Sequence, residues 1–243
     1  MTAQSKALCT ISTALILVLA GCASAPQYRI NPSFEEKKAA IKTVAVTEPR
    51  VEIFEVSAGG VKEKVDEWSQ VGAKNIRTSI ERELASRSAI RTKTLSEASL
   101  SKEAKANLDD TYTLFDAVNV SVIQHTYGRP EFNFTEKIQN FDYSLGPEVS
   151  GITSDADALL LVYGVDHVST AGRKALQGAA MVAGALLGVI PIPQSGPTAV
   201  IVALVHTRTG SILWYNLLPW GNFQDEVNVR TLVQTLLQEF PMR

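Results

Sequence analysis

The stretch DALLLVYGVDHV (Asp157 to Val168) is a nearly continuous apolar run of strand length. Two shorter runs near the carboxyl end, TAVIVALVH (Thr198 to His206) and ILWY (Ile212 to Tyr215), are joined by the glycine-containing loop TRTGS (Thr207 to Ser211). A run without polar alternation is typical of a strand that is covered on both faces. A short glycine-containing loop between two apolar runs predicts a β-hairpin. We therefore expect a sheet in which a buried strand accompanies an antiparallel hairpin.

Two further strands are expected in the amino-terminal part of the chain. Ile41 to Val46 (IKTVAV) and Val51 to Val56 (VEIFEV) alternate in polarity and are rich in β-branched residues, and Glu48-Pro49 separates them. These features are typical of strands. Ser57 to Gly60 (SAGG) would end the second strand in a turn, because its glycine pair lacks the lysine and the spacing of a phosphate-binding loop.

Three amphipathic helices are predicted around these strands. The first runs from Val61 to about Arg87, and Ser101 and Asp225 are expected to cap the second and third, since each precedes apolar residues at helical spacing. The expected apolar faces are Val61, Val65, Trp68, Ile76, Ile80 and Leu84; Ala104, Leu108, Tyr112, Phe115, Val118 and Val122; and Val229, Val233, Leu236, Leu237 and Phe240. With a brief strand at Ala89 to Leu95, the pattern predicts an α/β (α+β) fold, a mixed β-sheet flanked by helices.

The segment Gly128 to Pro147 (GRPEFNFTEKIQNFDYSLGP) combines glycine, proline, asparagine and four aromatic residues. We interpret it as an ordered excursion whose aromatic side chains pack against the domain. The alternative interpretation, a binding platform, makes this segment one of two places to look for a partner.

The amino terminus has the pattern of a cleavable secretory signal. Lys6 precedes the apolar run ALCTISTALILVLA (Ala7 to Ala20), which is shorter than the roughly 20 residues of a permanent membrane span. Leu19 to Cys22 (LAGC) then resembles the bacterial lipobox, in which a peptidase cleaves before a cysteine that carries diacylglycerol. The resemblance implies a signal peptide over residues 1–21, a lipid attached to Cys22 and a lipidated tether over residues 22–33.

The residue after the cysteine indicates in which membrane a lipoprotein is anchored. It is Ala23, whereas lipoproteins retained at the inner membrane of enteric bacteria typically carry aspartate there. By this resemblance the protein is expected at the periplasmic face of the outer membrane, provided that the organism has one. Two or three acyl chains would anchor it almost permanently, since each buried methylene contributes about 0.8 kcal/mol.

Net charge, cysteine content and chain length limit the partners and the fold that we expect. The formal net charge is −2 at pH 7, and removal of Lys6 with the signal makes it more negative, so we expect no binding of nucleic acid. Cys9 leaves with the signal and Cys22 would carry lipid, so the mature chain keeps no thiol for a disulfide or a metal. Roughly 220 mature residues suffice for one α/β domain, expected over residues 34–243.

An apolar insertion is expected at residues 173–193. Its core, ALQGAAMVAGALLGVIPIP (Ala175 to Pro193), has no charged residue, and about 16 residues before Pro191 are too few for a membrane span. The GxxxG spacing that allows close helix approach is formed by Gly184, Leu186, Leu187 and Gly188 with the intervening alanine. Three interpretations remain open: a helix packed on the sheet, a segment that dips into the membrane, and a self-association surface that builds a ring.

The carboxyl-terminal strands carry a family resemblance. ADALLL (Ala156 to Leu161) together with VALVHTRTGSILW (Val202 to Trp214) resembles lipoproteins related to the curli-secretion channel CsgG and to the TolB amino-terminal domain. The resemblance implies a mixed sheet flanked by helices, and it implies roles in envelope assembly, in secretion or in binding a cell-wall enzyme. His206 stands where that pattern usually has aspartate. The apolar insertion lacks the alternation of a membrane β-hairpin, which argues against a CsgG-like barrel.

No catalytic or metal-binding motif is recognised in the sequence. His125, His167 and His206 lie on different expected elements, and a metal bound by the last two would need further ligands. The carboxylate pairs Asp109-Asp110 and Asp155/Asp157 suit capping or turn roles. We therefore expect no cofactor, no metal and no small-molecule substrate.

The resulting functional hypothesis is a non-enzymatic lipoprotein that acts as a docking or assembly module in the bacterial cell envelope. Its expected partners are the membrane, through the lipid, and an envelope protein or further copies of the same chain. Two alternatives remain: a component of an oligomeric CsgG-like secretion channel, and a hydrolase whose site is not recognised.

Overall fold

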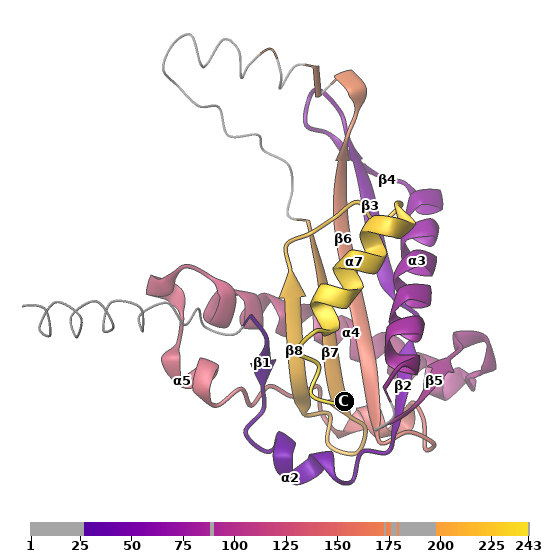
Figure 1. Cartoon of the computed structure of the whole chain (residues 1–243), viewed down its shortest axis with the longest axis vertical. Helices are drawn as coiled ribbons and strands as arrows, with labels where there is room; N and C mark the ends of the chain where they lie inside the picture. The colour runs from indigo at the N-terminus through magenta and orange to yellow at the C-terminus, as the bar shows by residue number, and fades with distance from the viewer. Residues whose placement is uncertain (1–26, 88–89, 173, 176–178, 180–197, 243) are drawn as a thin grey trace, which may run out of the picture.

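The computed structural model describes residues 27–87, 90–172, 174–175, 179 and 198–242. Within these residues lies an eight-stranded sheet of parallel and antiparallel strands with helices on both faces (Figure 1), which confirms the predicted α/β class. The strands are β1 (Arg29–Ile30), β2 (Thr43–Thr47), β3 (Arg50–Val56), β4 (Lys62–Lys64), β5 (Arg91–Leu95), β6 (Ala158–Ser169), β7 (Ala199–His206) and β8 (Ile212–Leu218). The helical segments are α2 (Phe34–Lys38), α3 (Asp66–Ala85), η1 (Glu97–Ser99), α4 (Lys102–Val122), η2 (Ile123–Tyr127), η3 (Pro130–Phe132), α5 (Thr135–Gln139), η4 (Pro147–Gly151) and α7 (Glu226–Leu237).

The buried strand β6 organises the sheet, whose order is β1-β8-β7-β6-β2-β5. On one side β6 pairs antiparallel with β7. On its other side β6 pairs first with β2 and then with β3, both parallel. Glu48-Pro49 separates these two partners, so the chain follows β6 as two collinear strands with a break between them.

The predicted hairpin is confirmed by the antiparallel pairing of β7 with β8. In its loop, Gly210 has a φ of +64°, and a Cβ at this position would collide with the carbonyl oxygen of Gly146. Glycine fits here because it adopts positive φ without steric cost. The loop is also tied to β6, because the Thr207 hydroxyl donates to the carbonyl oxygens of Ala156 and Asp157 at 2.9 and 2.8 Å.

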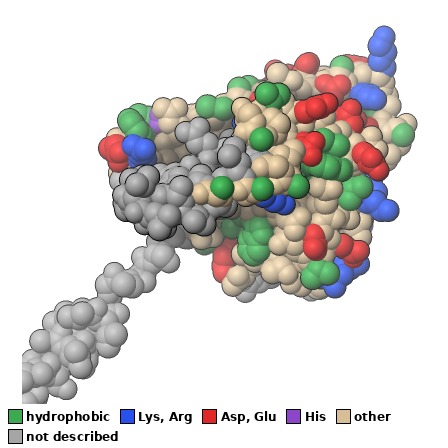
Figure 2. Space-filling view, turned by 90° about the horizontal axis from the view of Figure 1, so that it is seen from above, with side chains coloured by type: hydrophobic (Ala, Val, Ile, Leu, Met, Phe, Trp, Pro, Cys, Tyr) green, Lys and Arg blue, Asp and Glu red, His purple; other side chains and the backbone are tan. Residues whose placement is uncertain are grey.

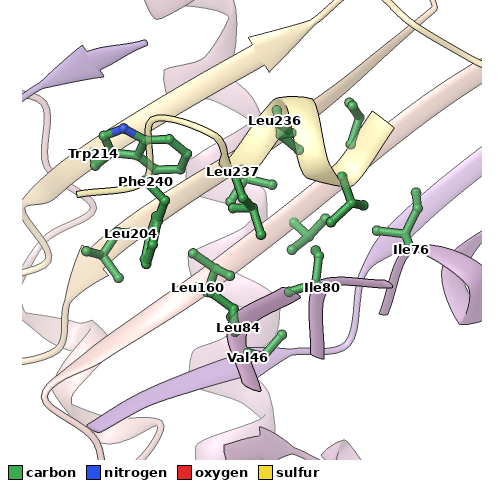
Figure 3. Close-up of a cluster of buried hydrophobic side chains, with 14 of the residues drawn as sticks. Val46, Ile76, Ile80, Leu84, Leu160, Leu204, Trp214, Leu236, Leu237 and Phe240 are labelled. Carbon is green, nitrogen blue, oxygen red and sulfur yellow. The ribbon is translucent and has the colours of Figure 1, made fainter. Parts of the chain in front are cut away.

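Helices α3 and α7 cover one face of the sheet with an apolar layer (Figure 3). Leu160 of β6 and Leu204 of β7 point from the sheet toward the helices, and Trp214 of β8 meets Phe240 edge-on with ring centroids 5.1 Å apart. As predicted, Asp225 caps α7, because its carboxylate accepts the backbone N–H of Asn228 at 2.9 Å. The aliphatic stripe of α7 is buried as the periodicity indicated.

The first helix begins later than the sequence pattern predicted. Val61 is 69% exposed, and the residues after it form β4, which pairs antiparallel with β3. Gly60 has a φ of +83°, so the turn that ends β3 sends the chain back along β3 instead of into a helix. Helix α3 therefore starts at Asp66, and Trp68 is partly buried against the core.

Helix α4 covers the opposite face of the sheet. Ser101 caps it as predicted, and its hydroxyl accepts the backbone N–H of Ala104 at 3.1 Å. The expected stripe faces the sheet, with Val118 only partly buried. This layer also holds two residues from outside the helix, Phe141 and Tyr215, and their ring centroids lie 6.0 Å apart.

The segment after α4 only partly follows its prediction. Phe141 is fully buried and Tyr143 partly so, as expected of packing residues. Phe132 and Phe134 are instead 54% and 55% exposed. They lie between η2 and α5, where short helical turns hold the backbone at the surface. Two of the four aromatic residues therefore do not serve the core.

The ordered domain extends further toward the amino terminus than the predicted boundary at residue 34. Strand β1 pairs antiparallel with β8, with Arg29 opposite Tyr215. The backbone N–H of Asn31 also donates to the carbonyl oxygen of Leu213 at 2.9 Å. Part of the expected tether thus belongs to the sheet. No helix in the described part of the chain is long and apolar enough to span a membrane.

Candidate functional site

A groove lies at the edge of the sheet where β2 gives way to β3, between α3 and α4. It has a volume of about 650 Å³, and we call it the edge groove. Its principal lining residues are Arg50, Glu52, Lys64, Gln70, Tyr112, Asp116 and Tyr163. The groove lies next to the break at Glu48-Pro49, where β3 begins. The start of β3 borders the groove because β4 pairs only with Phe54 to Val56.

Arg50 and Tyr112 contact each other in the edge groove. The Arg50 guanidinium lies 4.1 Å from the centre of the Tyr112 ring and donates a hydrogen bond to the Asp109 carboxylate. The Tyr112 hydroxyl donates to the carbonyl oxygen of Glu48 at 3.0 Å and lies 2.7 Å from the hydroxyl of Thr47. Burial raises the pKa of Tyr112 to about 12, so its hydroxyl stays neutral at ordinary pH. These contacts fix the orientation of the Arg50 side chain.

The lining of the edge groove carries charges of both signs. Lys64 donates to the Glu52 carboxylate at 3.0 Å. Tyr163 of β6 is half-buried, and its pKa is raised by burial and then by the carboxylates of Glu52 and Asp116. The surface seen in Figure 2 likewise intersperses acidic, basic and hydrophobic side chains. Such a groove offers hydrogen-bond donors and acceptors from both positively and negatively charged side chains. This mixture suits a polypeptide ligand better than a single anion or cation.

The site residues predicted from the sequence are not among those that the structure describes. Cys22, the expected lipid attachment point, lies outside the described residues. So do the residues of the expected membrane or self-association surface, Gly184, Leu186, Leu187 and Gly188.

The three histidines lie far apart in the fold. His206 pairs with Ala158 at the start of β6, and His167 lies near the other end of that strand, so strand pairing separates them. His125 follows α4, and its ring stacks on Phe134 at 4.4 Å. Within the described residues there is no group of three or more side chains that could hold a metal ion.

The carboxylate pairs have structural contacts. Burial would raise the pKa of Asp157, but its carboxylate accepts the backbone N–H groups of Lys42 and Thr43 at 2.8 and 2.9 Å, and the net pKa is lowered. Asp109 holds Arg50, and Asp155 lies 3.6 Å from the Lys93 ammonium. Asp157 therefore ties the start of β2 to the start of β6.

No family model matches this sequence, and neither a curated protein nor a solved structure matches it. The edge groove was also missed by sequence reasoning. Its one local signal was Glu48-Pro49, a strand break directly followed by Arg50.

Proposed function

We propose that this chain is a lipid-anchored protein of the bacterial cell envelope whose α/β domain docks a partner protein in the edge groove, without catalysis of its own. The observation that carries the docking proposal is the Arg50–Tyr112 pair, held in place by Asp109 and by the buried contacts of the tyrosine hydroxyl. Arginine and tyrosine are enriched among the residues that dominate protein–protein binding. A fixed side chain also loses little conformational freedom on binding.

The position of the edge groove supports presentation to a partner away from the membrane. Strand β1, the first strand after the proposed lipid site at Cys22, lies at one side of the sheet, and β3 lies beyond β8, β7 and β6. Four strand spacings of about 4.8 Å separate β1 from β3 by roughly 19 Å. The anchored edge and the edge groove therefore lie on opposite sides of the sheet (Figure 1).

Site-specific photo-crosslinking in intact cells tests the docking proposal. A photoreactive amino acid at Gln70, an exposed residue that lines the edge groove, should give a crosslink that Arg50→Ala abolishes. The matched control is Lys62→Ala, which removes a basic side chain of neighbouring β4 and should leave the crosslink unchanged. Circular dichroism verifies that each variant is folded. A crosslink that survives Arg50→Ala in the folded protein would contradict docking in the edge groove.

The anchor is tested separately. Mass spectrometry of the amino-terminal peptide should find a diacylglyceryl group on Cys22, and Cys22→Ser should move the protein from the membrane fraction to the soluble fraction. A chain that stays with the membrane after this substitution would contradict lipid anchoring.

A further inference from the structure

We propose that Phe132 and Phe134 form a second contact with the bilayer, beside the lipid anchor on which this inference rests. The two rings are 54% and 55% exposed, and we call them the aromatic surface. Exposed apolar side chains that gather in one place mark contacts with a partner or a membrane, and Phe132 and Phe134 are two residues apart and both contact His125. The occupant we assign is the bilayer that holds the chain's own lipid.

Local contacts hold the aromatic surface in place. The backbone N–H of Phe134 donates to the carbonyl oxygen of His125 at 3.0 Å, and the His125 ring stacks on the Phe134 ring. The backbone N–H of Phe132 donates to the carbonyl oxygen of Arg129 at 2.9 Å. The backbone that carries both rings is therefore held in the turn that follows η2, and the His125 ring covers one face of Phe134.

The same turn is fastened to the amino terminus of the domain. The Arg29 guanidinium lies 4.2 Å from the centre of the Tyr127 ring and donates to the carbonyl oxygen of Thr126. The ring of His125 stacks on Phe134, and His125 belongs to the same short helix η2 as Thr126 and Tyr127. The start of the domain and the aromatic surface thus share one support, and Figure 1 places β1 beside the segment that includes α5.

Chain length limits how far this support can lie from the bilayer. Five residue steps separate Cys22 from Gln27, where the described domain begins, and at about 3.6 Å per step they span no more than about 18 Å. A lipid on Cys22 therefore keeps Arg29 and η2 near the headgroup region. Exposed phenylalanine rings at that position would enter the boundary between headgroups and acyl chains.

The charges near the aromatic surface provide no net basic attraction to anionic lipid. Glu131 and Glu136 lie on either side of the two rings in sequence, and Arg129 precedes them. Lys137 donates to Asp142 at 2.7 Å, so its charge is already partnered. This balance does not favour anionic lipid over zwitterionic lipid, and the contact should depend little on salt.

Fluorescence from an environment-sensitive probe tests the inference on the full lipidated protein. Phe134→Cys is labelled with a nitrobenzoxadiazole dye, and the lipid on Cys22 leaves the new thiol as the labelling site. The control is Val227→Cys, which replaces a hydrophobic residue of α7 that is 71% exposed. In phosphatidylcholine vesicles with brominated acyl chains, the probe at position 134 should shift to the blue and lose at least half of its emission. The probe at position 227 should keep its water-like emission.

A second labelled variant, Phe132→Cys, guards against a local effect of one substitution and should respond in the same way. Water-like emission at both aromatic positions, in vesicle-bound protein whose Cys22 lipid is verified by mass spectrometry, would overturn the membrane contact while leaving the anchor intact. Protection of both probes without bromolipid quenching would assign the aromatic surface to a protein partner and overturn the inference as well. Absence of the lipid would overturn the anchor itself, and the proposed contact with it.

Discussion

The two faces of the sheet are both covered and buried, but their chemistry differs. Under α3 and α7 the layer is mainly aliphatic, with Leu160 and Leu204 at its centre. Under α4 the layer includes tyrosines that carry a hydroxyl, among them Tyr112 and Tyr215. The edge groove is lined by residues of both α3 and α4, and the aromatic surface follows α4 directly in the chain. The comparison teaches that aliphatic packing dominates the α3–α7 face, whereas the α4 face also holds polar side chains such as Tyr112, which supports Arg50 in the edge groove.

The largest expected effect tests whether both faces are packed to the same density. Leu159 and Leu160 are neighbours in β6, are fully buried and point to opposite faces. Leu159→Ala and Leu160→Ala should each lower the free energy of unfolding by about 2–5 kcal/mol, measured by urea denaturation. Val227→Ala, at an exposed position, should change it by less than about 0.5 kcal/mol. A tolerated alanine at position 159 alone would break the comparison, because the α4 face would then be loosely packed.

The next effect concerns the polar atoms of the α4 face. Tyr112→Phe should lower the free energy of unfolding by about 1–3 kcal/mol, because the carbonyl oxygen of Glu48 and the hydroxyl of Thr47 lose a buried partner. The same variant should weaken the crosslink in the edge groove. Tyr163→Phe is the control, since that ring is only half-buried and should cost less than about 1 kcal/mol. Equal losses for the two variants would argue against a special role for the Tyr112 hydroxyl.

The third prediction compares the N-terminal caps of α4 and α7, the helices that cover the two faces of the sheet. Ser101→Ala at α4 and Asp225→Ala at α7 should each lower the free energy of unfolding by about 0.5–2 kcal/mol. The cost at Asp225 should shrink as salt is added, because its charge also interacts with the helix dipole. Asp225→Asn keeps the accepting oxygen and should recover most of the loss. A salt-dependent cost at Ser101 would contradict this explanation.

The smallest expected effect is a pH dependence at His206. Burial, followed by the charge of Arg208, lowers its pKa in the folded protein, so the unfolded chain takes up the proton first. Its contribution to stability is therefore present above the unfolded pKa of about 6.5 and is lost as pH falls through the folded pKa. His206→Gln should flatten the decline in stability between neutral and mildly acidic pH. An NMR titration that places the folded pKa above 6.5 would reverse the sign.

Local pattern predicted much of the architecture correctly. The β7–β8 hairpin, the buried strand β6 and the helices capped by Ser101 and Asp225 each depend on spacing and turn chemistry within a short window. The start of α3 was wrong, because the apolar residues Val61 and Val65 fit a helical period by chance, whereas the turn at Gly60 and pairing with β3 draw that segment into the sheet. The helical periodicity of a segment does not show whether a distant strand can pair with the same residues.

The sequence by itself determined the class of the fold, the caps and the lipobox pattern, because apolar periodicity, capping side chains and short motifs act between residues that are close in the chain. The tertiary structure decided the edge groove and the aromatic surface. Arg50 meets Tyr112 across 62 positions, and Arg29 meets Thr126 across 97, through packing of α4 against the sheet. Such contacts depend on how whole elements are stacked, and no short window of sequence carries that information.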